Sequence, residues 1–365
     1  MAASVIEGIR IGGLACAVPT GKIETKSYES RFGEDDIRKF IDMVGVKERY
    51  VSVEKQTGSD LCFVAAEELM EKKQIEASSI DAVIYMCQIP DYKQPSTALV
   101  LHKRLNLRND CIAFDINLGC TGFIYGVSVM ASLIHAGLVN RGLLLVGEVS
   151  RADKNTSDHS NAMMFGDAGA ACIIEKGEGQ IETLLKSDGN GFHIMGIPGG
   201  QARHPLDKQN PDWESLEPHM DGFETFRFAI TKAPAAWKEF SKIWGKKAED
   251  YDYVLFHQSN KFMVDHIAHK MKLKPEQYPM SIDRYGNTNG VSIPVTLADL
   301  CGRVKLEGPL KLLCIAFGVG LSWGVLSLEI AAEDVLPMIY SDDYFGEAYE
   351  TVFGKGRETE EQANE

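Results

Sequence analysis

The chain has 365 residues, of which 44% are hydrophobic and 25% are charged, a composition typical of a globular protein with a full apolar core. Its formal net charge of −14 argues against nucleic acid or an anionic membrane as a general partner. We find neither a basic leader before an apolar core nor an apolar run long enough to cross a bilayer, so we expect a cytoplasmic protein without a membrane span. The eight cysteines are scattered, mostly in apolar runs, which predicts buried thiols rather than a disulfide scaffold or a metal site.

The first half of the chain alternates apolar runs typical of strands with stretches of helical periodicity. Strands are predicted at residues 6–15, 82–87, 111–116, 143–149 and, after a glycine turn, 165–174. Helices are predicted at 27–44, 61–73, 96–105 and 121–135. This alternation predicts an α/β fold with a largely parallel sheet.

The second half repeats the same order of elements. Strands are predicted at 181–185, at 253–257 and on both sides of a glycine turn within 312–328, and helices at 223–244, interrupted by Pro234, and at 260–272. We therefore predict a duplicated βαβαβαββ unit with halves at 1–178 and 179–334, followed by an acidic, partly disordered tail at 335–365. Two such halves are expected to stack as α-β-α-β-α layers, with equivalent loops of both halves at one crevice.

Cys120 stands where the strand at 111–116 breaks at Gly119 and the helix at 121–135 begins. A thiol at the start of a helix faces the positive end of the helix dipole, which lowers its pKa from about 8.5 toward neutrality. Backbone N–H groups of the same turn are suited to hold a developing oxyanion. This context predicts a nucleophile that forms a thioester, and the alternative is a small, inert buried residue.

Two polar residues of the second half occupy positions that the duplication brings to the same crevice. His257 ends a predicted strand, and Asn287 lies in a loop with a glycine on either side. Each has a structural alternative, because a strand-end histidine is often structural and an asparagine among glycines often fills a positive-φ turn. The duplicated topology favours their meeting with Cys120.

Three short motifs carry these residues: Asn-Leu-Gly-Cys120-Thr-Gly-Phe, Phe-His257-Gln-Ser-Asn and Tyr-Gly-Asn287-Thr. As a set they resemble the ketoacyl-acyl-carrier-protein synthase III group of thiolase-fold condensing enzymes. Similar patterns, such as Phe-Gly-Asp-Ala-Gly-Ala170 and Phe317-Gly-Val-Gly, extend the resemblance over roughly residues 5–332. No single motif is specific, whereas the combination is.

The resemblance implies a role for each of these residues. Cys120 would accept an acyl group from a thioester, and His257 and Asn287 would donate hydrogen bonds to the carbonyl of a malonyl-type thioester while it loses its carboxylate. The backbone N–H groups of Cys120 and Val319 would form the oxyanion hole. The product would be a 3-oxoacyl thioester, with substrates carried on acyl carrier protein or coenzyme A, no further cofactor, and a homodimer as the active form.

Some positions depart from the pattern of the group. Lys39 stands where the group often has a tryptophan against the adenine of coenzyme A, Met43 replaces a basic residue, and His159 replaces a typical arginine. These departures put the adenine contacts in doubt and favour a carrier protein as the source of substrate.

Two further sites follow from the resemblance. Gln94 lies just before Pro95, where the group places a bulky apolar gate that enters the acyl pocket of the partner subunit, so a polar gate indicates an unusual acyl group. Arg227 lies where the group presents a basic residue to its carrier, in the basic stretch 224–247 that also contains Lys232. A solvated helix face is the alternative for that stretch.

Two other functions remain open at this point. A cysteine–histidine acyltransferase that passes its acyl group to an amine, a hydroxyl or another acceptor without decarboxylation would need the same residues. A catalytically silent partner subunit is disfavoured, because Cys120, His257 and Asn287 are all retained. The residues do not select the acyl chain, the acceptor or the pathway.

Overall fold

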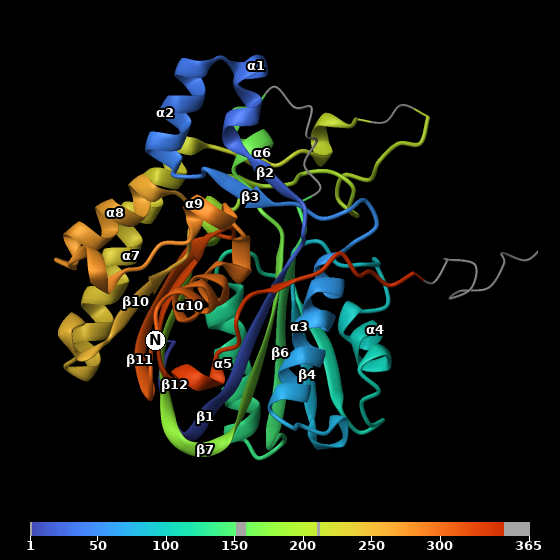
Figure 1. Ribbon diagram of the computed structural model, residues 1–365, viewed down its shortest axis with the longest axis vertical. Coiled ribbons are helices and arrows are strands. Elements are labelled where there is room, and N and C mark those ends of the chain that lie inside the picture. Colours follow the sequence, from blue (N-terminus) through green and yellow to red (C-terminus); the bar gives the residue numbers. More distant parts are fainter. Residues whose placement is uncertain (1, 151–157, 210–211, 347–365) are drawn as a thin grey trace, which may run out of the picture.

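A computed structural model of the chain describes residues 2–150, 158–209 and 212–346 (Figure 1). The strands are β1 (Ala3–Val18), β2 (Lys22–Glu24), β3 (Glu48–Tyr50), β4 (Ala82–Met86), β5 (Ile112–Ile116), β6 (Arg141–Glu148), β7 (Ala168–Ser187), β8 (Met195–Gly196), β9 (His219–Met220), β10 (Tyr253–Phe256), β11 (Pro309–Gly318), β12 (Ser322–Ala331) and β13 (Ile339–Tyr340). The helices are α1 (Glu29–Phe32), α2 (Glu34–Val44), α3 (Gly58–Lys72), α4 (Thr97–Arg104), α5 (Gly122–His135), α6 (His159–Met163), α7 (Gly222–Trp244), α8 (Lys261–Lys270), α9 (Ile282–Tyr285) and α10 (Ser292–Arg303).

The two halves of the sheet are joined through the long strands β1 and β7. The strand order is β10-β11-β12-β7-β6-β4-β5, and β1 runs antiparallel to β7 along its length. The first part of β7 pairs with β6 and its last part with β12. Separate strands had been predicted at 165–174 and 181–185, but one continuous strand crosses the proposed boundary between residues 178 and 179, because β1 supplies hydrogen-bond partners on both sides of it.

Three apolar clusters establish the layers. The central cluster joins α5 and α10 to inward-facing residues of both halves of the sheet. Along β11, Leu312, Cys314 and Ala316 face this centre, whereas Leu313, Ile315 and Phe317 face α7 and α8 on the outside. A third cluster packs α3 and α4 against the other half of the sheet. The expected α-β-α-β-α order is therefore present, with α7 and α8 on one side of Figure 1 and α3 and α4 on the other.

Several local predictions differ from the structure. The helix predicted at 27–44 is divided into α1 and α2 at Gly33, which has a φ of 87°. By contrast, α7 continues through Pro234, where we predicted an interruption. Proline leaves the carbonyl four residues earlier without its helical donor, and the Lys270 ammonium of α8 donates to that carbonyl of Ile230 at 3.0 Å. In the second half, residues 271–291 contain α9 but no counterpart of β5.

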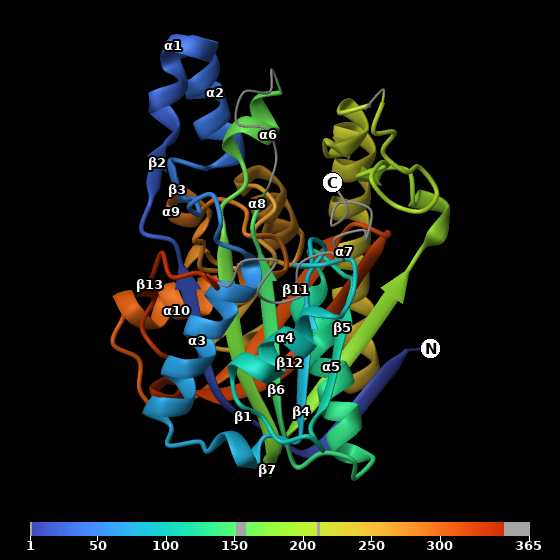
Figure 2. The same cartoon turned by 90° about the vertical axis from the view of Figure 1, so that its right-hand side faces the viewer.

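The described end of the chain is part of the fold. Strand β13 lies parallel to β1, so residues 335–346 pack on the first half, while 347–365 fall outside the described residues (Figure 2). Over the described ranges, no helix has both the length and the apolar character needed to cross a bilayer.

Candidate active site

Cys120 lies at a sharp elbow between β5 and α5, as the sequence predicted. A side chain at Gly119 would collide with the Gln88 carboxamide, and a Cβ at Gly318 would lie 2.6 Å from the Cys120 sulfur. Both glycines therefore allow close contact of neighbouring loops with the thiol. The backbone N–H groups of Val319 and of Cys120 itself both act on the thiol in the direction that favours the thiolate.

The expectation of a lowered thiol pKa is wrong. Burial raises the pKa of Cys120 to about 11, and the two backbone N–H groups only partly oppose this effect. Desolvation disfavours the thiolate more than the turn stabilises it, so Cys120 carries its proton at neutral pH.

The turn that carries Val319 is tied to the elbow by two hydroxyl groups. Ser322 Oγ donates to the Val319 carbonyl at 2.9 Å and lies 2.8 Å from Thr121 Oγ1. Because Thr121 follows Cys120 directly, these contacts fix the distance between the thiol and the Val319 amide.

His257 follows β10 and is almost completely buried. Its backbone N–H donates to the Ile315 carbonyl at 2.9 Å, which extends the pairing of β10 with β11 by one residue. The ring atom Nδ1 lies 2.8 Å from Ser292 Oγ, and the Phe317 ring packs edge-on at 5.8 Å between centroids. Burial lowers the imidazole pKa to about 4, and a hydrogen bond to the backbone of Asn289 partly opposes this shift. The ring is therefore neutral at physiological pH and has one N–H to donate.

Asn287 is held from both its backbone and its side chain. Its N–H donates to the Met164 carbonyl at 2.9 Å, and its carbonyl accepts from Gly166 at 3.2 Å. Its Oδ1 accepts the Asn289 N–H at 2.9 Å. Since the oxygen of the carboxamide is engaged in this way, the Nδ2 amide is the part of the side chain that is available to donate to a ligand.

Close contacts between loops bring the three predicted residues together. A Cβ at Gly290, in the Asn287 loop, would lie 2.7 Å from the Gly119 carbonyl of the elbow. Phe317 contacts His257, and the next residue, Gly318, contacts Cys120. The loops of Cys120, His257 and Asn287 therefore lie against one another, as expected from the duplication.

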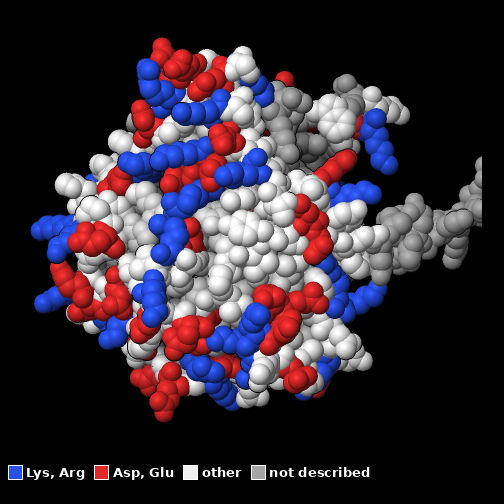
Figure 3. Space-filling view, in the orientation of Figure 1, with Lys and Arg blue, Asp and Glu red and all other residues white. Residues whose placement is uncertain are grey.

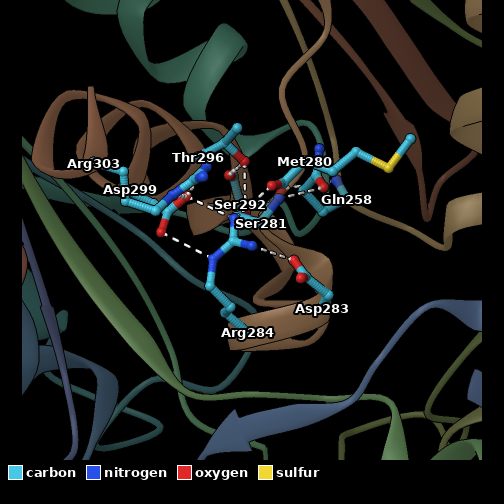
Figure 4. Close-up of polar contacts among 9 residues, drawn as sticks. All are labelled: Gln258, Met280, Ser281, Asp283, Arg284, Ser292, Thr296, Asp299 and Arg303. Carbon is cyan, nitrogen blue, oxygen red and sulfur yellow. Dashed lines mark hydrogen bonds and ion pairs between the residues drawn. The ribbon is translucent and has the colours of Figure 1, made fainter. Parts of the chain in front are cut away.

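A polar network behind the crevice was not predicted (Figure 4). Gln258 Nε2 donates to the Phe256 carbonyl at 3.0 Å. Gln258 Oε1 accepts the Ser281 N–H at 3.2 Å. Ser281 Oγ lies 2.8 Å from Thr296 Oγ1, which donates to the Ser292 carbonyl at 2.7 Å. The network links the His257 strand to α10. Ser292 was missed because its role depends on a contact across 35 residues of sequence.

Glu148 is a second residue that sequence reasoning missed. It ends β6, has only 4% of its surface exposed, and accepts the Gln88 N–H at 2.7 Å. Burial raises its pKa to about 8, so the carboxyl is mostly protonated at neutral pH. Its negative charge, where present, further raises the pKa of Cys120. The only indication of a buried carboxyl in the sequence was a single acidic residue at the end of an apolar run.

The predicted gate and carrier residues have other surroundings. Gln94 is exposed in the loop before α4. Arg227 is 65% exposed and pairs with Glu224 at 2.5 Å, and the Lys232 ammonium lies 5.2 Å from the centre of the Trp323 ring. Among the described residues, no group of three or more histidine, cysteine or acidic side chains could hold a metal ion.

Three positions were noted as departures from the pattern of the resembled enzymes. Lys39 and Met43 lie on α2, and His159 begins α6. Lys39 pairs with Asp36 at 3.1 Å, and Met43 is largely exposed. The His159 ring packs against Phe32, with 4.1 Å between centroids. One face of the His159 ring is therefore already covered by an aromatic side chain.

Comparisons with known proteins agree with this fold. Two sequence models, 3-oxoacyl-[acyl-carrier-protein (ACP)] synthase III and the C-terminal part of the same family, match residues 114–189 and 244–330. A putative 3-oxoacyl-[acyl-carrier-protein] synthase 3 of Campylobacter jejuni is 34% identical over 329 residues, which cover 86% of this chain and 92% of the relative. The crystal structure of a 3-oxoacyl-(acyl-carrier protein) synthase from Burkholderia xenovorans matches with a TM-score of 0.86 at 33% identity, covering 93% of this chain and 99% of that one.

Fold and site together define a thiolase-fold condensing enzyme, which transfers acyl groups with decarboxylation. The chain belongs to the 3-oxoacyl-acyl-carrier-protein synthase III family. The predicted family, fold class and enzyme class are thereby confirmed.

Proposed function

We propose that Cys120 accepts an acyl group from a thioester and that His257 and Asn287 promote the decarboxylation of a malonyl-type thioester that then condenses with it. In the first step the Cys120 sulfur bonds to the acyl carbon, and the departing thiol carries away the Cys120 proton. In the second, the bond to the malonyl carboxylate breaks, CO₂ leaves, and the electron pair forms an enolate. The enolate carbon attacks the acyl carbon, and Cys120 leaves as a thiolate that takes up one proton from solvent.

The single observation that carries this proposal is the close packing of the Cys120 elbow against the loops that present His257 and Asn287, through Gly318 and Gly290. The neutral imidazole N–H of His257 and the carboxamide N–H of Asn287 are suited to stabilise an enolate oxygen, because each donates a hydrogen bond without giving up its proton. The pKa of about 4 for His257 keeps it in this neutral form throughout the physiological range. This chemistry needs no cofactor beyond the two thioesters.

We further propose acyl carrier protein as the source of at least one substrate, docked on α7. Arg227 and Lys232 lie in the first half of this helix, Lys238 and Lys242 lie in its second half, and Lys247 follows its end. On the face seen in Figure 3 the basic and acidic side chains are interspersed, so the overall charge of −14 does not form one acidic surface there. Phe32 covers one face of the His159 ring, and Met43 is exposed. Both observations favour a weak contact with the adenine of coenzyme A, and so a carrier protein as the source of substrate.

A homodimer and a cytoplasmic location complete the proposal. Within the described residues the outer edge of β5 has no strand partner, and Ile112 on that strand and Leu99 on α4 are both exposed. A sheet edge of this kind is suited to pairing with a second copy. Such a partner would lie beside the loop of Gln94, because Asp115 of β5 accepts the N–H of Thr97 at 2.6 Å. All eight cysteines are unpaired, which fits a reducing compartment.

The two half-reactions are tested separately with His257→Ala and Asn287→Ala. Loss of an oxyanion donor typically costs about a hundredfold or more, so each variant should slow malonyl-thioester decarboxylation by at least that factor. Acylation of Cys120, followed by intact-protein mass, should be less affected. Unchanged decarboxylation in both variants would favour an acyltransferase that does not decarboxylate. The proposed homodimer is tested separately by measuring the molecular mass of the protein in solution.

A further inference from the structure

Residues 333–346 form a strap that lies beyond the family match, which ends at residue 330. The strap runs along β1, where the Leu336 N–H donates to the Leu14 carbonyl at 2.8 Å and the Ser341 N–H donates to the Val18 carbonyl at 3.0 Å. Strand β13 within it pairs in parallel with β1. The strap is thus an added edge strand of the first half rather than a loose tail.

The far end of the strap is anchored on α3 and α4. The fully buried Gln56 donates from Nε2 to the Ser341 carbonyl at 2.9 Å and to the Asp343 carbonyl at 3.0 Å. The Phe345 N–H donates to Asp60 at 2.9 Å, and the Phe345 ring lies 4.9 Å from the Arg104 guanidinium. These anchors hold the strap at a fixed register against the body of the protein.

The middle of the strap packs against Tyr50 through Tyr340. The Tyr340 ring lies 5.4 Å from Tyr50, which lies 5.5 Å from Tyr285. The Tyr340 side chain contributes to raising the pKa of both Tyr50 and Tyr285. Burial and this contribution together raise the pKa of Tyr50 to about 12. Three tyrosine rings from distant parts of the sequence therefore form one cluster.

Two members of this cluster border the Asn287 loop. Tyr285 is buried and ends α9, so it precedes Gly286 and Asn287 directly. The Tyr50 carbonyl accepts the Asp167 N–H at 3.0 Å, and the adjacent Gly166 donates to the Asn287 carbonyl at 3.2 Å. The strap contacts Tyr50, and Tyr50 borders the loop in two ways: its ring packs near Tyr285, and its carbonyl holds the segment whose Gly166 donates to Asn287.

We propose that the strap fixes the Asn287 loop through Tyr340, which acts as a positioning residue for the decarboxylation half-reaction. This inference rests on the proposed function, because it assigns Asn287 to that half-reaction. Cys120 and Val319 are held by Thr121 and Ser322, with no residue of the strap among these contacts. Loss of the Tyr340 ring should therefore affect the Asn287 loop while acylation of Cys120 continues.

The test compares Tyr340→Ala with Phe345→Ala, a matched control that removes an aromatic ring of the same strap at a point away from Tyr285. A displacement of a donor by about 1 Å costs up to about a hundredfold, so Tyr340→Ala should slow malonyl-thioester decarboxylation by about tenfold or more. Acylation of Cys120 should stay within about twofold of wild type. Phe345→Ala should leave both rates near wild type, and Tyr340→Phe should lie between.

Hydrogen–deuterium exchange of the peptide spanning 282–291 gives a readout that is independent of activity. Tyr340→Ala should accelerate exchange there, whereas Phe345→Ala should not, because of these two rings only Tyr340 packs against the tyrosine cluster that borders the loop. Unchanged exchange and unchanged decarboxylation in Tyr340→Ala would overturn the inference, as would parallel losses of both half-reactions in the two strap variants. If Asn287→Ala alone retained decarboxylation, the proposed function would fail, while the exchange data would still decide whether the strap holds the loop.

Discussion

Gly318→Ala is expected to damage the oxyanion hole without removing any polar group. The added Cβ would lie 2.6 Å from the Cys120 sulfur. Ordinary contacts between such atoms lie near 3.5–4.0 Å, so the thiol or the turn must move by about 1 Å. The movement separates the sulfur from the Val319 N–H, which is one of the two backbone donors that favour the thiolate.

The magnitude follows from the loss of that donor. Removing one oxyanion-hole hydrogen bond typically costs about a hundredfold to a thousandfold in rate, or about 2.7–4 kcal/mol. Acylation of Cys120 by an acyl thioester should therefore slow by at least about a hundredfold. The rate is measured by rapid quench and intact-protein mass, with the melting temperature recorded to establish that the variant is folded.

Gly302→Ala is the matched control. Gly302 lies in α10, and no atom would approach within 4 Å of a Cβ there. Alanine in place of glycine inside a helix stabilises by about 0.5–1 kcal/mol, so this variant should melt slightly higher and acylate at the wild-type rate. A folded Gly318→Ala variant that acylates as fast as Gly302→Ala would refute the assignment of the Val319 amide.

Two other predictions concern charge. The folded-state pKa of Glu148, about 8, lies above its ordinary value of 4.5, so the folded protein binds more protons between these values and Glu148 lowers stability as the pH rises through that window. Glu148→Gln should flatten this decline, and identical slopes for the two proteins in denaturant titrations at several pH values would contradict the buried, protonated carboxyl. Charge reversal at Arg227 and Lys232 should slow turnover of carrier-bound substrate, most strongly at low ionic strength, yet spare small pantetheine thioesters. Equal losses for both substrate forms, or tight binding of coenzyme A by the unmodified protein, would remove α7 as the docking site.

The sequence predicted the elements around the site because their signals are local. The apolar run before Gly119 and the helical stretch after Cys120 define the elbow without reference to the rest of the chain. The duplication then predicted that the loops of His257 and Asn287 would join it, and contacts of Gly290 and Gly318 confirm that meeting.

Features that depend on distant contacts could not be predicted in the same way. The predicted pKa of Cys120 was too low. The start of the helix can be recognised in the sequence, whereas the burial that dominates the thiol pKa cannot. Ser292 reaches His257 only after α10 packs beside β10. Tyr340 lies in a region of acidic residues that indicated disorder, and its order comes from pairing with β1 at the other end of the chain.

Intact-mass analysis of the protein incubated with a panel of acyl-carrier and acyl-coenzyme A thioesters tests the central claim most directly. The mechanism predicts one acyl adduct per chain, located on Cys120 by peptide mapping, absent in a folded Cys120→Ala variant, and discharged as a 3-oxoacyl thioester with release of CO₂ when a malonyl thioester is added. An adduct on another cysteine, or discharge to an acceptor without CO₂, would contradict it.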